Sequence, residues 1–491
     1  MKLYVKKSQI KPGKMSESTL KRTLKARHLV MISLGGSIGT GLFLASGGAI
    51  YKAGPGGAML AYVVISIMVY FLMSSLGEMS AHSPTTGTFC EYSSRYVSAD
   101  FGFAMGWNYW FNWAITVSTE VIAAAFIMQY WFPGIDTIVW SISFFLLVFL
   151  INLMSVKIYG EVEYWLSSIK VAFIIFFVIV SLLAIIGVAS FGNPVGFQNW
   201  QIGDAPFHNG FLGFMSVFLI SGFSLQGTEL VGVAAGETLN PRKSIPQAIK
   251  QTFWRLMVFY IFTIGVISFL IPYNSDALIN QHSSIAVSPF TIILNNFGFK
   301  YVATIMNAVI LIAVLSACNA SMYSATRMIW HLSKTNQAPK ILSKINSKGT
   351  PFNALLATAL IGCFFFSSSF FGSGFVFFWL VNISSLSGFI AWFGIALSHY
   401  RFRRAYCKQG LIIDKLPYKA KLFPIAPIVS MVMITIIILG QECYSILTFQ
   451  ISWKKFLMTY IGFLFFLLLL FSYKLIKKSK VIPLTECDVV T

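Results

Sequence analysis

Apolar stretches long enough to cross a membrane recur along almost the whole of this 491-residue chain. A helix needs ~20 mostly apolar residues to span ~30 Å of hydrocarbon, and about twelve windows meet this requirement. They lie at residues 29–50, 57–81, 103–130, 138–156, 164–189, 211–235, 254–273, 301–328, 354–371, 375–400, 423–441 and 453–475. Membrane β-strands would give short alternating segments instead. The sequence therefore predicts an all-α polytopic membrane protein.

The charged residues support this prediction and give it an orientation. Only 11% of the chain is charged, too little to cover a soluble protein of this size, yet its formal net charge is +20. Most basic residues fall in alternate connections, at residues 2–27, 242–255, 327–348, 401–421 and after 474. By the positive-inside rule, both termini lie in the cytoplasm, as expected for a cytoplasmic (inner) membrane protein. Nucleic-acid binding is disfavoured, because the charge is spread over helix ends.

The N-terminal residues and the cysteines exclude several other features. The first 27 residues are polar and basic and no small-residue cleavage site follows, so we expect no removable signal peptide. The six cysteines are scattered without a CxxC pair, which predicts neither a disulfide framework nor a zinc site. We expect no metal, no cofactor and no enzymatic activity.

Two of the apolar windows are interrupted in their middles by small residues. The first break reads GGSIGTG at residues 35–41, and the second reads SGFSLQGTE at residues 221–229. Unwound backbone survives at membrane depth only where it faces protein or a wet cavity, so a matched pair of breaks indicates a binding site. The alternative is helix packing through the Gly35–Gly39 spacing. Unwinding explains the pattern better, because the glycines surround the helix rather than line one face.

The positions of the breaks predict an inverted repeat. They fall in the first and sixth windows, so the second copy enters the membrane from the opposite side. We therefore expect a cytoplasmic arm at residues 1–27, five-helix repeats at 28–190 and 211–402, appended helices 11 and 12 at 403–475, and a cytoplasmic tail at 476–491. Residues 283–297 match no full crossing and are interpreted as an external lid or re-entrant helix.

Three ionisable residues lie well inside the predicted spans, away from their ends: Glu120, Lys170 and Glu229. Each costs ~2.5–3.5 kcal/mol at a helix centre, which suggests a function, although structural pairing or snorkelling would also explain them. A broken helix exposes N–H groups that bind carboxylates, here near residues 37–41, and C=O groups that bind ammonium, here near Gly222 and Phe223. That combination suits an α-amino acid. The two acids would compensate a side-chain cation, or one would take a proton.

Several motifs resemble those of the amino acid permeases of the amino acid–polyamine–organocation superfamily, and within it the bacterial permeases for lysine. The resemblance covers residues from about 20 to about 475. It is carried by KARHL at 25–29, GGSIGTGLF at 35–43, AGPGG at 53–57, GWNYW at 106–110, GFSLQGTEL at 222–230, AAGE at 234–237 and SHYRFRR at 398–404.

This resemblance implies a twelve-helix, five-plus-five inverted-repeat transporter driven by protons. It implies substrate-binding roles for Ser37, Gly39, Thr40, Gly41, Glu120, Phe223, Ser224, Gln226, Gly227, Thr228 and Glu229, with Phe223 as a thin gate. Lys170 and Glu229 would couple protons, and Lys170 could also replace a bound Na⁺ near the first and eighth spans. The chain departs from the family in one respect, because lysine permeases have aspartate where this chain has Glu120.

Other polar residues have competing explanations. Asn319 and Ser321 would complete the surroundings of Lys170, or would only pack helices together. Glu237 would act in gating, or would cap a helix or pair with Arg242. For His28, Trp107 and Asn108, which lie near interfaces or helix starts, we expect anchoring.

The expected function is import of L-lysine with a proton. Arginine, ornithine or a broader set of amino acids remain alternatives as substrates, and exchange remains an alternative to net uptake. Arginine's planar fork prefers bidentate carboxylates, whereas two separated acids can share the point charge of lysine. A transporter-like sensor that reports an amino acid to a partner is a different class that stays open. A channel is disfavoured, because no ring of like charge or selectivity loop is present.

Overall fold

The computed structural model describes residues 20, 22–188, 194–279, 288–298, 300–346, 349–367, 373–442 and 452–489. Most of the predicted arm and residues 283–287 of the predicted lid, with Cys443, lie outside these ranges. Within them all regular elements are helical, apart from an isolated bridge between Leu24 and Thr238. The predicted all-α class is confirmed.

Eight helical segments of the described chain are long and apolar enough to span a membrane. They are Ala45–His82 (α3), Ala99–Met128 (α5), Val156–Ile185 (α7), Gly210–Glu237 (α8, α9 and η2), Pro241–Leu270 (α10), Tyr301–Lys334 in α13 (Lys300–Lys334), Val376–Lys408 in α15 (Ser373–Lys408) and Phe456–Lys477 in α18 (Trp453–Lys477). Three shorter apolar helices accompany them, α6 (Thr137–Asn152), α14 (Phe352–Ser367) and α16 (Ile425–Gly440). The first predicted span begins as α1 (Ala26–Ser37) and α2 (Thr40–Phe43).

The first two predicted spans meet at a kink inside α3. Gly54 has φ +74°, which glycine adopts without strain, and Pro55 follows it. A side chain at Gly54 would meet the Pro206 carbonyl oxygen at 2.7 Å. The Gly56 N–H donates to that same oxygen at 2.9 Å, so the loop before α8 closes over the kink.

This loop carries a hydrogen-bonded carboxylate. Asp204 accepts from the Tyr273 hydroxyl at 2.6 Å and lies 2.7 Å from His208 Nδ1. The Tyr273 hydrogen bond and then the His208 contact lower the pKa of Asp204 to about 2, so this carboxylate stays ionised even at acidic pH.

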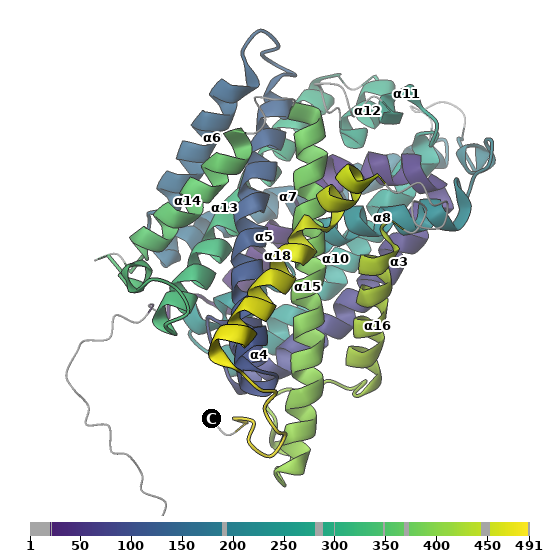
Figure 1. The fold of residues 1–491 in the computed structure, drawn as a ribbon. Helices are drawn as coiled ribbons and strands as arrows, with labels where there is room; N and C mark the ends of the chain where they lie inside the picture. Colours follow the sequence, from purple (N-terminus) through teal and green to yellow (C-terminus); the bar gives the residue numbers. More distant parts are fainter. Residues whose placement is uncertain are drawn as a thin grey trace, which may run out of the picture.

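The bundle is organised around α5, which packs against α13, α15, α18, α14, α6 and α4 (Thr88–Tyr96). A second group forms where α3 packs on α8 and α10, and where α1 packs on α7, α10 and α13. In Figure 1 the short helices α11 (Asp276–Ile279) and α12 (Pro289–Asn296) lie at one end, and α4 and the C-terminus lie at the other. The described part of the predicted lid is thus a short helix at the bundle end, where the Ser288 hydroxyl donates to the Phe43 carbonyl at 2.7 Å.

Candidate functional site

The first break is shorter than the sequence predicts. Helix α1 continues through Gly35 and Gly36 to Ser37, and α2 begins at Thr40, so only Ile38 and Gly39 leave the helical path. Side chains of neighbouring helices explain the two helical glycines. A Cβ at Gly35 would collide with the Glu163 carboxylate, and one at Gly36 with the Leu230 side chain. Packing and unwinding therefore both contribute to this motif.

The second break is also narrower than predicted. Helix α8 runs to Leu225, and the chain leaves the helix from Gln226 to Glu229 before α9 (Leu230–Val233). The Gly222 and Phe223 carbonyls, near which the sequence predicts ammonium binding, accept from the Gln226 N–H at 3.0 and 3.3 Å. Glycine permits unwinding without forcing it, and here the helical hydrogen bond persists.

The two breaks contact each other through their backbones. Gly227 has φ +99°, and a Cβ there would lie 2.6 Å from the Gly36 carbonyl carbon. A Cβ at Gly41 would lie 2.5 Å from the Ser224 Cα. The Tyr260 hydroxyl lies between the Ser37 carbonyl, at 2.7 Å, and the Ser224 carbonyl. The unwound segments thus form a single structural unit.

Replacing Gly227 by alanine is expected to destabilise the protein. Alanine is strained at this φ, and its Cβ would have to displace the backbone of the first break. The matched control is Gly410→Ala, where φ is +76° but nothing lies within 4 Å of a Cβ. Thermal unfolding should be measured for both variants. Equal behaviour of the two would contradict the proposed backbone contact.

Lys170 binds carbonyl groups at the C-terminal end of α1. Its Nζ donates to the Gly35 carbonyl at 2.7 Å and to the Ile38 carbonyl at 2.9 Å, and its side chain is fully buried. These oxygens belong to the last turn of the helix and to the break. An ammonium is favoured there by the carbonyl dipoles.

Glu163 is a site residue that the sequence reasoning missed. It is fully buried on α7 and accepts hydrogen bonds from Ser316 and from Asn319 Nδ2, the latter at 3.2 Å. It also interacts electrostatically with Lys170. The predicted span began one residue after Glu163, which placed this acid outside the membrane. Its position two helical turns before Lys170 was the available signal, since that spacing places both on one face.

The two polar candidates of the eighth predicted span, Asn319 and Ser321, make different kinds of contact. Asn319 joins the Lys170 surroundings through Glu163, and its Oδ1 accepts from Asn152 Nδ2 at 2.8 Å. The Ser321 hydroxyl instead donates to the Ala317 carbonyl one turn earlier, at 2.7 Å. That bond matches the packing explanation for Ser321.

Glu120 is a residue of α5, and its side chain lies beside the first residue of α2. Its Oε1 accepts from the Thr40 hydroxyl at 2.9 Å, and only 3% of the residue is exposed. Its other oxygen, Oε2, is buried without a hydrogen-bond partner among the described residues. A Cβ at Gly39 would lie 3.0 Å from this carboxylate. The acid therefore adjoins the helix end where the sequence predicts the substrate carboxylate.

Glu229 folds back over the second break and is held by neutral donors. Its Oε2 accepts from the Gly227 N–H at 3.1 Å and from Trp392 Nε1 at 3.2 Å. Its Oε1 accepts from the Tyr109 hydroxyl at 3.3 Å. The aromatic residues Tyr109 and Trp392 come from α5 and α15, so this carboxylate joins three parts of the bundle.

The remaining predicted site side chains stabilise the breaks. Gln226 Nε2 donates to the Ser384 and Ser385 carbonyls at 3.2 and 3.1 Å. The hydroxyls of Ser37, Ser224 and Thr228 donate to carbonyls three or four residues earlier in their own segments. The predicted gate, Phe223, is buried with 6% exposed.

The inner end of the sixth span is fixed by an ion pair that differs from the predicted one. Glu237 Oε1 accepts from Arg327 Nε at 2.6 Å, and both residues are buried. The predicted partner, Arg242, is exposed at the start of α10, because the Asn240–Pro241 turn carries the chain past Glu237. The Glu237 carbonyl accepts from the Thr23 and Leu24 N–H groups at 3.0 Å, so the N-terminal arm docks here.

The expected anchoring residues make structural contacts. His28 Nε2 lies 3.1 Å from the Glu161 carboxylate. Trp107 Nε1 donates to the Gln337 carbonyl at 3.2 Å, and Asn108 Nδ2 donates to the Ser387 carbonyl at 2.8 Å.

Comparison with known proteins agrees with this geometry. A sequence model of the family described as amino acid permease matches residues 28–483. The lysine-specific permease LysP of Escherichia coli (strain K12) is 50% identical over 468 residues, which cover 95% of this chain and 96% of the relative. The histidine permease HisP of Lactococcus lactis subsp. cremoris (strain MG1363) is 46% identical over 473 residues, which cover 96% of this chain and 98% of the relative. A crystal structure of the Eremococcus coleocola manganese transporter matches with a TM-score of 0.55 at 12% sequence identity, over 92% of this chain and 94% of that one. At this identity the match supports a shared fold only.

Proposed function

The chain belongs to the amino acid permease family, and we propose that it imports L-lysine together with a proton across the cytoplasmic membrane. Both termini lie in the cytoplasm in this proposal, as the positive-inside rule requires. The similarity to a lysine-specific permease supports lysine as the substrate. The observation that carries the proposal is the set of buried charges around the two breaks.

Counted in their ionised forms, these buried groups do not balance. Glu120, Glu163 and Glu229 are buried carboxylates, and Lys170 is the buried cation that faces the first break. Three negative charges and one positive charge leave a net charge of −2. Lysine brings +1 and one proton brings +1, so together they neutralise the site. A net charge in a low-dielectric interior is costly, which favours joint binding of both ions.

The breaks suggest where the parts of the substrate bind. The N-terminus of α2 at Thr40 would hold the α-carboxylate, with Glu120 released from Thr40 to face a substrate ammonium. Glu229 would take the proton, because neutral donors surround it in place of a cation. Phe223 would close the site, and rocking of one five-helix group against the other would open it inward.

Uptake by the purified protein in proteoliposomes tests the substrate. We expect excess unlabelled lysine to abolish uptake of radiolabelled lysine, with weaker competition by arginine, ornithine, histidine and neutral amino acids. Arginine carries the same charge but requires bidentate carboxylates. Uptake without any other protein would also exclude a function limited to sensing. If histidine competes and lysine does not, the proposed substrate is wrong.

Replacing Glu120 by glutamine is expected to reduce the preference for cationic substrates. A hydrogen bond to a charged group contributes about 1.5–3 kcal/mol, so half-saturating lysine should rise about tenfold or more. The control is Glu161→Gln, which removes a partly exposed carboxylate that pairs with Arg27. Competition by arginine and neutral amino acids should be compared in both variants. An unchanged preference in Glu120→Gln would remove the assigned role.

A further inference from the structure

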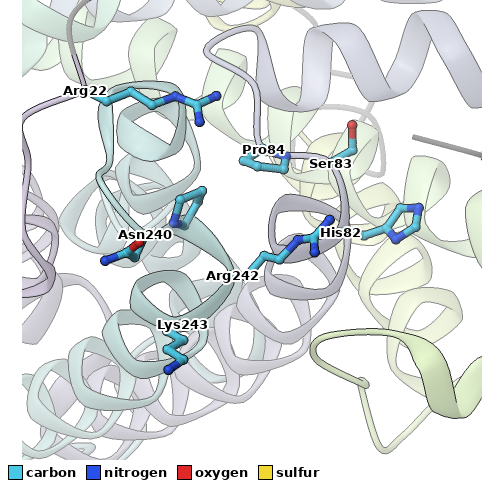
Figure 2. A pocket seen from close by; sticks show the side chains of 8 residues that line it. Arg22, His82, Ser83, Pro84, Asn240, Arg242 and Lys243 are labelled. Carbon is cyan, nitrogen blue, oxygen red and sulfur yellow. The ribbon is translucent and has the colours of Figure 1, made fainter.

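A cavity of about 620 Å³ lies between three segments at the inner end of the bundle, away from the two breaks. Arg22 comes from the N-terminal arm, His82, Ser83 and Pro84 follow α3, and residues 240–243 begin α10. In Figure 2 the Arg22 guanidinium points toward Pro84, the Arg242 guanidinium lies beside His82, and Lys243 points away from both. Two cationic groups from distant parts of the sequence therefore face one cavity.

The cavity lining contains cations without a carboxylate. Elsewhere in the described chain, four arginines pair with acids, in Arg27–Glu161, Arg95–Glu91, Arg327–Glu237 and Arg403–Glu78, and two others, Arg401 and Arg404, donate to backbone carbonyls or to the Tyr400 hydroxyl. Among the residues that the structure places, Arg22 and Arg242 have no such partner. Arg22 and Arg242 are both exposed, so each guanidinium group is free to turn toward an anion in the cavity.

We infer that this cavity binds a phosphate-bearing anion. The planar guanidinium groups of Arg22 and Arg242 match phosphate oxygens in bidentate geometry. The first turn of α10 adds the positive end of a helix dipole, because Asn240 is its N-cap and Pro241 its first residue. The volume exceeds that of one phosphate ion. The ligand is therefore either free phosphate or the phosphate of a lipid headgroup, since basic pockets between cytoplasmic helix ends suit anionic lipids.

A bound anion would also link the cytoplasmic end of the first broken span, through Arg22, to that of the sixth, through Arg242. The arm that carries Arg22 leads directly into α1, and its Leu24 pairs with Thr238 after η2 (Ala234–Glu237). A Cβ at Gly236 would collide with Thr86, so the segment after α3 packs against the same point. An anion that bridges Arg22 and Arg242 would hold this end closed. This consequence for transport rests on the proposed function, whereas anion binding does not.

Binding should be measured by thermal unfolding and calorimetry on the full-length protein in detergent, without lysine. The probes are inorganic phosphate and phosphatidylglycerol micelles, with sodium chloride at equal ionic strength as the comparison. We expect a saturable increase in Tm with phosphate or with phosphatidylglycerol. A response to phosphate identifies free phosphate as the ligand, and a response to the lipid alone identifies a headgroup.

The variant Arg22→Gln/Arg242→Gln should bind at least about tenfold more weakly, since each guanidinium contributes a charge-assisted hydrogen bond. The control Lys340→Gln/Lys344→Gln removes the same charge from an exposed loop and should bind like the wild type. An unchanged Tm without ligand shows that the variant folds. Equal responses to chloride and phosphate, or wild-type binding by the arginine variant, would overturn the inference. Neither result depends on whether lysine is the substrate.

Discussion

Replacing Lys170 by methionine is expected to abolish lysine uptake driven by a pH gradient. The substitution removes the donor to the Gly35 and Ile38 carbonyls and the positive charge that acts on the buried carboxylates Glu163 and Glu120. Loss of this ammonium leaves the neighbouring buried carboxylates and the two carbonyl groups less compensated, which is costly in a low-dielectric interior. Uptake with and without an imposed gradient, in the same preparation of proteoliposomes, measures the loss.

The control for this variant is Lys157→Met, the same substitution at an exposed position of the same helix. If Lys170→Met fails to fold, the double variant Glu163→Gln/Lys170→Met removes both charges together and should recover stability. We expect it to fold without coupling uptake to the gradient. Gradient-driven uptake at the wild-type rate in either Lys170 variant would show that this ammonium has no role in coupling.

Glutamine in place of Glu229 is expected to abolish concentrative uptake while lysine exchange continues. The amide has nearly the same shape: its oxygen can still accept from the Gly227 N–H and Trp392 Nε1, and its NH2 group can donate to the Tyr109 hydroxyl oxygen, so the second break should persist. It cannot release or take up a proton. Net accumulation and exchange of external for internal lysine should be measured in parallel.

Loss of both activities in Glu229→Gln would assign the residue to binding rather than to proton coupling. Retention of both would remove it from the mechanism. Glu486→Gln, at an exposed position near the C-terminus, controls for the loss of one carboxylate and should retain both activities.

The fold was largely predictable from the sequence, because in a membrane the apolar length of each segment limits its structure. The spans, the short helix α12 and the interruption of the first and sixth spans follow from hydropathy and small residues. The extent of each break does not follow. Residues 35–36 and 221–225 remain helical because neighbouring side chains pack against glycine there or because the helical hydrogen bonds persist.

The candidate site was predictable only in part. Glu120, Lys170 and Glu229 stand out because charges are rare in apolar windows. Glu163 does not, because the start of α7 could not be located to within a few residues, and the charge lies near that boundary. The pairing of Glu237 with Arg327 depends on how η2 and α13 approach each other in space, which no local pattern encodes.

The central claim is that this permease carries lysine and a proton together through the site between the two breaks. The direct measurement is accumulation of radiolabelled lysine in proteoliposomes that are acidic outside, under a clamped membrane potential, with a parallel record of internal pH. We predict that lysine accumulates above its external concentration and that the interior acidifies faster when lysine is present. A protonophore should collapse the pH gradient by itself, abolish lysine accumulation and remove the lysine dependence of acidification. Lysine uptake that ignores the pH gradient and moves no protons would contradict the account.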